Sequence, residues 1–85
     1  MNLEKITENA ENLNIVLNDD KLLILKIVYD YYSNNQKYPT RRIILTKVKE
    51  EKHNISSIML HKMFGEQTFT NISKILQLPD PDQCL

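Results

Sequence analysis

The stretch that decides how this chain folds is residues 18–34, NDDKLLILKIVYDYYSN. Asn18 is a suitable N-cap, and Asp19 and Asp20 put negative charge in the first turn, where the helix dipole favours it. The apolar residues that follow recur at the three- and four-residue spacings of an α-helix: Leu22, Ile24, Leu25, Ile27, Val28, Tyr31 and Tyr32. This apolar stripe is wide, so we expect a helix over residues 19 to about 34 at the centre of the fold.

Weaker helical patterns flank this segment. A first amphipathic helix is predicted around residues 3–13. On the other side, residues 33–37 read as a polar loop, and Pro39 forces the residue before it away from helical angles. Thr40 or Pro39 then opens a helix to about residue 52, with three residues facing inward: Ile44, Leu45 and Val48.

Two shorter helices follow. Ser56 or Ser57 caps one whose apolar face consists of Met59, Leu60, Met63 and Phe64. Gly65 ends it in a left-handed conformation. A last helix, starting at Thr68 or Thr70, has its apolar residues at spacings of three and four: Phe69, Ile72, Ile75 and Leu76.

The predicted fold class is mainly α. With one glycine and three prolines in 85 residues, the chain has little material for hairpin turns. We expect one domain over residues 1–77, a small orthogonal bundle of four to five helices. Residues 78–85 follow as a flexible, extended C-terminal arm, since Pro79 and Pro81 exclude a helix there.

Composition bounds the function classes. With 41% hydrophobic and 26% charged residues the chain is too apolar for disorder and too polar for a membrane protein. The start MNLEKITENAEN lacks the basic flank and apolar stretch of a signal peptide, so we expect a cytoplasmic protein without membrane contact. A lone cysteine rules out an internal disulfide framework.

Charge is balanced in sum but uneven along the chain. Residues 41–65 contain six basic and two acidic side chains, a local charge of +4. Such a segment suits contact with a nucleic acid or an acidic protein, although a solvated helix face is the commoner explanation. The two helices around the loop at residues 34–39, with Arg41 and Arg42 opening the second, also allow a helix-turn-helix interpretation.

Metal and cofactor chemistry has no support. His53, His61 and Cys84 supply at most three nitrogen or sulfur ligands, without the spacings of known metal motifs. A single glycine cannot form a glycine-rich phosphate loop. The four tyrosines fall at helical spacings or at a helix edge, which favours packing over base stacking. We therefore expect neither a metal nor a cofactor.

Cys84 is the residue that composition alone does not explain. It is the only cysteine and the second-last residue, behind the sequence Pro-Asp-Pro-Asp-Gln. A structural cysteine would be placed among core residues, and the nearby carboxylates disfavour a strongly nucleophilic thiolate. Two interpretations stay open: an accidental tail cysteine, or an exposed thiol that carries a group into a partner's pocket.

The tail resembles that of a known family. Residues 73–85, SKILQLPDPDQCL, are similar to the C-terminal arm of the DsrC/TusE sulfur-carrier proteins, which runs Lys-Ile-x-x-Leu-Pro-x-Pro-x-x-Cys and one apolar residue. The matching positions are Lys74, Ile75, Leu78, Pro79, Pro81, Cys84 and Leu85. A second stretch matches the family's Asp-aromatic-Tyr, loop, Pro-x-x-Arg pattern, with Arg42 as the arginine.

Departures from the family pattern indicate which branch of the family the chain resembles. The sulfite-reductase branch carries a second cysteine eleven places before the penultimate one, where this chain has Ser73. Without that cysteine no intramolecular disulfide can form, which points to the TusE branch. The family's N-terminal β-meander is expected to be absent, since the chain begins near the first family helix.

The resemblance implies a cytoplasmic sulfurtransferase that acts as a persulfide carrier. Cys84 would accept sulfur from an upstream complex of the TusBCD type and hand it to the MnmA-type enzyme that thiolates the wobble uridine of tRNA. Arg42, with Arg41, would bind a partner or brace the arm. The alternative is a non-catalytic partner or helix-turn-helix module that binds nucleic acid.

Overall fold

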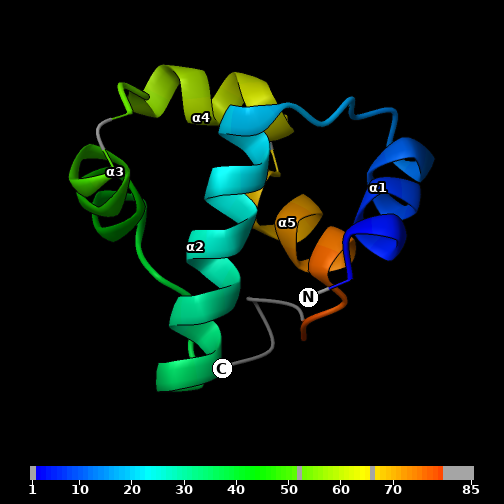
Figure 1. Ribbon diagram of the computed structural model, residues 1–85, viewed down its shortest axis with the longest axis horizontal. Coiled ribbons are helices and arrows are strands. Elements are labelled where there is room, and N and C mark those ends of the chain that lie inside the picture. Colours follow the sequence, from blue (N-terminus) through cyan, green and yellow to red (C-terminus); the bar gives the residue numbers. More distant parts are fainter. Residues whose placement is uncertain (1, 52, 66, 80–85) are drawn as a thin grey trace.

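A computed structural model describes residues 2–51, 53–65 and 67–79, and Figure 1 shows their arrangement. The elements in chain order are α1 (Leu3–Asn12), α2 (Asp19–Asn35), α3 (Arg41–Glu50), α4 (Ser57–Phe64) and α5 (Thr68–Leu76). No strand occurs among the described residues. The prediction of a mainly α fold with four to five helices is therefore confirmed.

Side-chain caps explain where three of the helices begin. Asn18 accepts a hydrogen bond from the Lys21 amide at 2.9 Å. Thr40 and Ser56 do the same at the starts of α3 and α4, each at 3.2 Å. Such a cap typically contributes about 1 kcal/mol, because it satisfies an amide that has no partner within the helix. These positions agree with the predicted N-caps.

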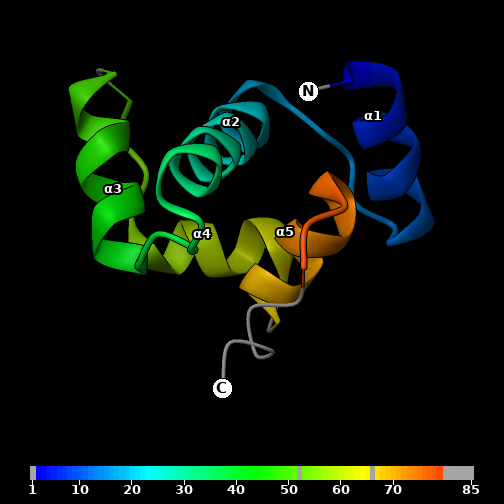
Figure 2. The ribbon, with the colours of Figure 1, turned by 90° about the horizontal axis from the view of Figure 1, so that it is seen from below.

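The core forms around α2, as its apolar stripe predicts. Ile24, Leu25 and Val28 have no exposed surface. Figure 1 shows α2 in the middle, with α1 and α3 on opposite sides of it. In Figure 2 the view runs nearly along α2 while α3 is seen from the side, so these two helices cross steeply. The other fully buried large side chains come from α3, α4 and α5: Ile44, Val48, Leu60, Phe64, Ile72 and Ile75.

One predicted face differs from the structure. Met59 was expected on the buried side of α4, but it is 41% exposed, whereas Leu60 and Phe64 are 0% and 1% exposed. Leu60 and Phe64 are four residues apart and therefore share a face, and Met59 is turned about 100° away from Leu60. The exposed side of α4 also carries Ile58, at 67% exposure.

The first and last helices pack against each other. Ile6 and Ala10 of α1 are buried, as are Ile72 and Ile75 of α5. Between them the side-chain amide of Asn9 donates a hydrogen bond to the Ile75 carbonyl at 3.0 Å, a contact between residues 66 positions apart.

No helix of the described part of the chain has the length and apolar character needed to cross a bilayer.

Candidate functional site

The C-terminal arm leaves the bundle through an ordered turn at the end of α5. Gln77 takes a left-handed conformation, with φ 59° and ψ 40°, and its amide donates to the Ser73 carbonyl. The Leu78 amide donates to the same carbonyl at 2.9 Å. This six-to-one hydrogen bond is the mark of a Schellman-type C-cap, in which the residue after the turn also makes an apolar contact. Leu78 does so, since its side chain is partly buried against the core.

The next residue is held by a loop from the other half of the chain. The Tyr38 hydroxyl donates a hydrogen bond to the Pro79 carbonyl at 2.5 Å, across a sequence separation of 41 residues. Tyr38 lies between α2 and α3 and packs partly buried against the core. Its ring is tilted at 56° against that of Tyr32, with centroids 5.0 Å apart. The root of the arm is thus attached at two points, Leu78 and Pro79.

Arg41 and Arg42 begin α3, directly after the loop that contains Tyr38. Both side chains are exposed, and no ion pair between described residues involves either of them. Arg42 follows Tyr38 by four residues, so their Cα atoms are at most ~14 Å apart. The two arginines therefore follow the loop that holds Pro79 within a few residues along the chain.

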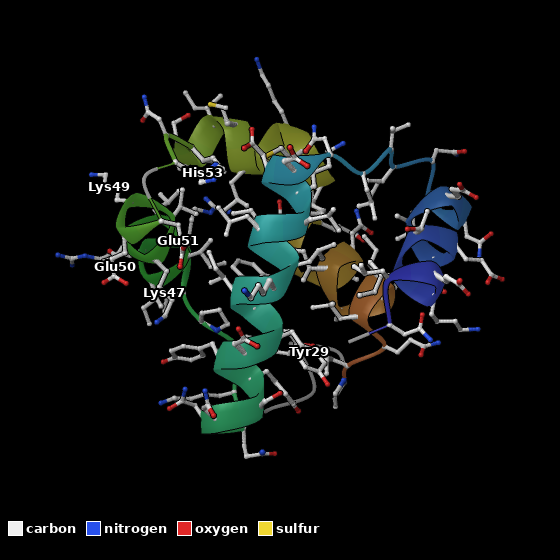
Figure 3. All side chains as sticks on the ribbon, in the orientation of Figure 1. Tyr29, Lys47, Lys49, Glu50, Glu51 and His53 are labelled. Carbon is white, nitrogen blue, oxygen red and sulfur yellow. The ribbon has the colours of Figure 1, made fainter. Side chains whose placement is uncertain are left out.

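Acidic side chains lie near one lysine of the predicted basic segment. Figure 3 shows Lys47 and Lys49 near the end of α3, where Glu50 and the following residue Glu51 also lie. Lys47 and both glutamates line a polar groove of about 260 Å³ between α2 and α3, together with Asp30. Asp30, Glu50 and Glu51 thus surround the groove that Lys47 lines, whereas the N-terminal end of α3 begins with two arginines.

The two histidines do not form a metal site with other described residues. His53 Nδ1 lies 3.3 Å from a carboxylate oxygen of Asp20, and both side chains are largely exposed. His61 is exposed on α4. Within the described ranges no three or more histidine, cysteine, aspartate or glutamate side chains come together as a metal would require.

A shallow groove adjoins the other side of the arm root. Its volume is about 240 Å³, and it is lined by Asn2, Lys5, Ile6, Tyr29, Ile75, Leu76 and Gln77. Figure 3 shows Tyr29 extending from α2 on the side where α5 lies. The end of α5 is therefore bordered by a tyrosine of α2 on this side, while Tyr38 holds the chain that follows it.

Cys84 lies outside the described residues, as do all of residues 80–85. The role of its thiol stays a prediction, and so does the division into a bundle and a flexible arm. Ser73, which stands where one family branch has a second cysteine, is 2% exposed. Its hydroxyl donates to the Thr70 carbonyl at 2.7 Å. Cys84 is five positions after Pro79, so its Cα can lie at most ~17 Å from that anchor.

Sequence reasoning did not find the role of Tyr38. It treated all four tyrosines as packing residues, which is correct for the Tyr32–Tyr38 ring pair but omits the bond to Pro79. The only local signal is the tyrosine directly before Pro39, in an otherwise polar loop. Nothing in that pattern identifies a partner far along the chain.

Comparison with known proteins identifies a family and a curated relative. The family model described as "DsrC like protein" matches residues 2–85. Among curated proteins, the chain is similar to the sulfurtransferase TusE of Buchnera aphidicola subsp. Acyrthosiphon pisum (strain APS), with 29% identity over 86 residues. That similarity covers 99% of this chain and 75% of the relative. The family match extends through the arm root and the residues after it.

Proposed function

The chain belongs to the DsrC-like protein family, and from that premise we propose that it is a sulfur carrier that holds sulfur on Cys84 as a persulfide. The observation that carries the proposal is the family match over residues 2–85, which includes the arm and its single cysteine. The similarity to a protein named as a sulfurtransferase supports the same class of chemistry.

The proposed chemistry consists of two sulfur transfers without net oxidation. The Cys84 thiolate attacks the outer sulfur of a donor persulfide, a new sulfur–sulfur bond forms, and the donor leaves as a thiolate. An acceptor thiolate then attacks the outer sulfur of the Cys84 persulfide, and Cys84 leaves as a thiolate. Each step breaks one sulfur–sulfur bond and makes another, so no separate oxidant or reductant is needed.

Such a relay requires Cys84 to enter two different pockets in turn. The arm is attached to the bundle up to Pro79. The five residues beyond this anchor then supply a reach of at most ~17 Å. A long, freely diffusing tail would lose more entropy on docking than this short segment does, which favours a tethered thiol.

The proposed sulfur donor and acceptor are those of the TusE branch. We propose that an upstream carrier complex of the TusBCD type supplies the sulfur, and that an MnmA-type enzyme with bound tRNA receives it for thiolation of wobble uridine in the cytoplasm. The exposed guanidinium groups of Arg41 and Arg42, at the start of α3, suit an acidic protein surface or a phosphate. The alternative, a helix-turn-helix nucleic-acid module, would use α2 and α3 and would not need Cys84.

Intact-mass measurement tests the carrier function. After incubation with a cysteine desulfurase, cysteine and loaded upstream carriers, the protein should gain about 32 Da, the mass of one sulfur atom, and lose it on reduction. Cys84→Ser should gain nothing. If the native protein stays unmodified while the upstream carriers are loaded, the carrier function is wrong. If Cys84→Ser keeps cellular function and changes at Arg41 and Arg42 abolish it, the alternative module is favoured instead.

A further inference from the structure

We propose that Tyr38 is the positioning residue for the Cys84 arm: its hydroxyl holds the Pro79 carbonyl and thereby sets the direction in which the thiol leaves the bundle. This inference rests on the proposed carrier function. According to this inference, sulfur transfer depends on Tyr38, which lies in the loop between α2 and α3, as well as on the arm itself.

The hydroxyl is pre-oriented by contacts on both sides of Tyr38. The ring packs against that of Tyr32, with centroids 5.0 Å apart. The following residue, Pro39, is buried and restricts the backbone of Tyr38 to extended angles. Tyr38 itself packs partly buried against the core. The phenol therefore points at Pro79 from a side chain whose rotation is already limited, and little further entropy is lost when the bond forms.

The point of attachment is what gives this bond its effect. Pro79 has a fixed φ because of its ring. Holding its carbonyl oxygen also limits its ψ, so the chain leaves residue 79 in a defined direction. Leu78, one residue earlier, is already held by its amide and its side chain. The bond from Tyr38 therefore fixes the position of Pro79 as well, one residue beyond Leu78.

Tyr38→Phe tests this bond, because it removes the hydroxyl and keeps the ring that packs on Tyr32. Tyr32→Phe is the matched control, since it removes a hydroxyl from the other member of the ring pair. Each protein is labelled at Cys84 with a nitroxide, which needs no engineered site because the chain has one cysteine. The fraction of molecules with a released arm should rise roughly two- to ten-fold in Tyr38→Phe, as expected for loss of one hydrogen bond, and stay unchanged in the control.

Two further measurements separate positioning from a purely structural role. The carbonyl ¹³C resonance of Pro79 should shift in Tyr38→Phe and not in Tyr32→Phe. In sulfur transfer with unlabelled protein, KM for the acceptor should rise by roughly two- to ten-fold in Tyr38→Phe with kcat unchanged, because a less ordered arm docks less readily but reacts equally once docked.

Identical nitroxide spectra and Pro79 resonances in the two variants would overturn the proposal. So would a released arm with unaltered KM. The nitroxide and ¹³C measurements need no sulfur donor, so they distinguish this proposal from the carrier function itself. If wild-type Cys84 takes up no sulfur while the arm is released in Tyr38→Phe, the carrier function has failed and the attachment of the arm by Tyr38 stands.

Discussion

Three nested truncations test how far the folded domain extends into the C-terminal arm. The chain is ended after Pro79, after Leu78 or after Gln77. The first protein keeps every contact described for the arm root. The second loses the Pro79 carbonyl that accepts from Tyr38. The third also loses the Leu78 side chain, partly buried against the core, and the bond from the Leu78 amide to the Ser73 carbonyl.

The expected losses of unfolding free energy follow from these contacts. Ending the chain after Pro79 should change stability by less than about 0.5 kcal/mol, as for most surface changes. Ending it after Leu78 removes one hydrogen bond, worth about 1 kcal/mol. Ending it after Gln77 removes a second hydrogen bond and the partial burial of a leucine, about 1 kcal/mol each, for a total of about 3 kcal/mol. In a domain of this size that total corresponds to a melting temperature lower by roughly 12–24 °C.

Thermal and urea unfolding followed by far-ultraviolet circular dichroism would measure these differences. Tyr38→Phe supplies an internal check: it should lower stability in the full chain but add nothing to the protein ended after Leu78, where its bond partner is already gone. A loss above about 2 kcal/mol on ending the chain after Pro79 would show that the last six residues help to stabilise the fold. Full stability after removal of Leu78 would refute the anchoring described above.

Three other substitutions test separate parts of the structure. Gly65→Ala should lower stability by about 1–3 kcal/mol, because φ 85° and ψ −174° suit only glycine; an unchanged melting temperature would contradict this. A thiol introduced by Ser73→Cys should react with a soluble disulfide reagent at least about tenfold more slowly than Cys84, because position 73 is 2% exposed, and equal rates would show that α5 opens readily. Arg42→Ala should leave stability within about 0.5 kcal/mol and slow sulfur transfer at low salt more than Lys49→Ala does; equal slowing would exclude a special role for the N-terminal end of α3.

Local signals in the sequence were sufficient for the helices. The caps at Asn18, Thr40 and Ser56 and the positive φ of Gly65 depend on residues within a few positions of each other, so spacing and residue type predict them. Met59 is a residue for which these local signals gave a wrong prediction. Its helix has apolar residues at so many positions that periodicity does not decide which of them face inward, and packing against α5 selects Leu60 and Phe64.

Part of the candidate site could likewise be predicted from the sequence, and part of it needed the structure. Cys84 was identified from its position in the chain and from the family resemblance, without any structural information. The bond between Tyr38 and Pro79 joins two irregular segments 41 residues apart, and irregular segments have no period from which a contact can be predicted. The distribution of charge on α3 also needed the structure, because only the fold brings Asp30 beside Lys47.

The packing of α1 against α5 has a consequence for how the protein is made. α5 follows the other described helices along the chain, and the Asn9–Ile75 contact cannot form before α5 has left the ribosome. Until then Ile6 and Ala10 lack the helix that buries them, and a domain generally folds as a unit once its elements are present. A nascent chain that stops before α5 therefore leaves apolar surface uncovered and is exposed to proteases, whereas α1 is covered only once α5 has been made and released.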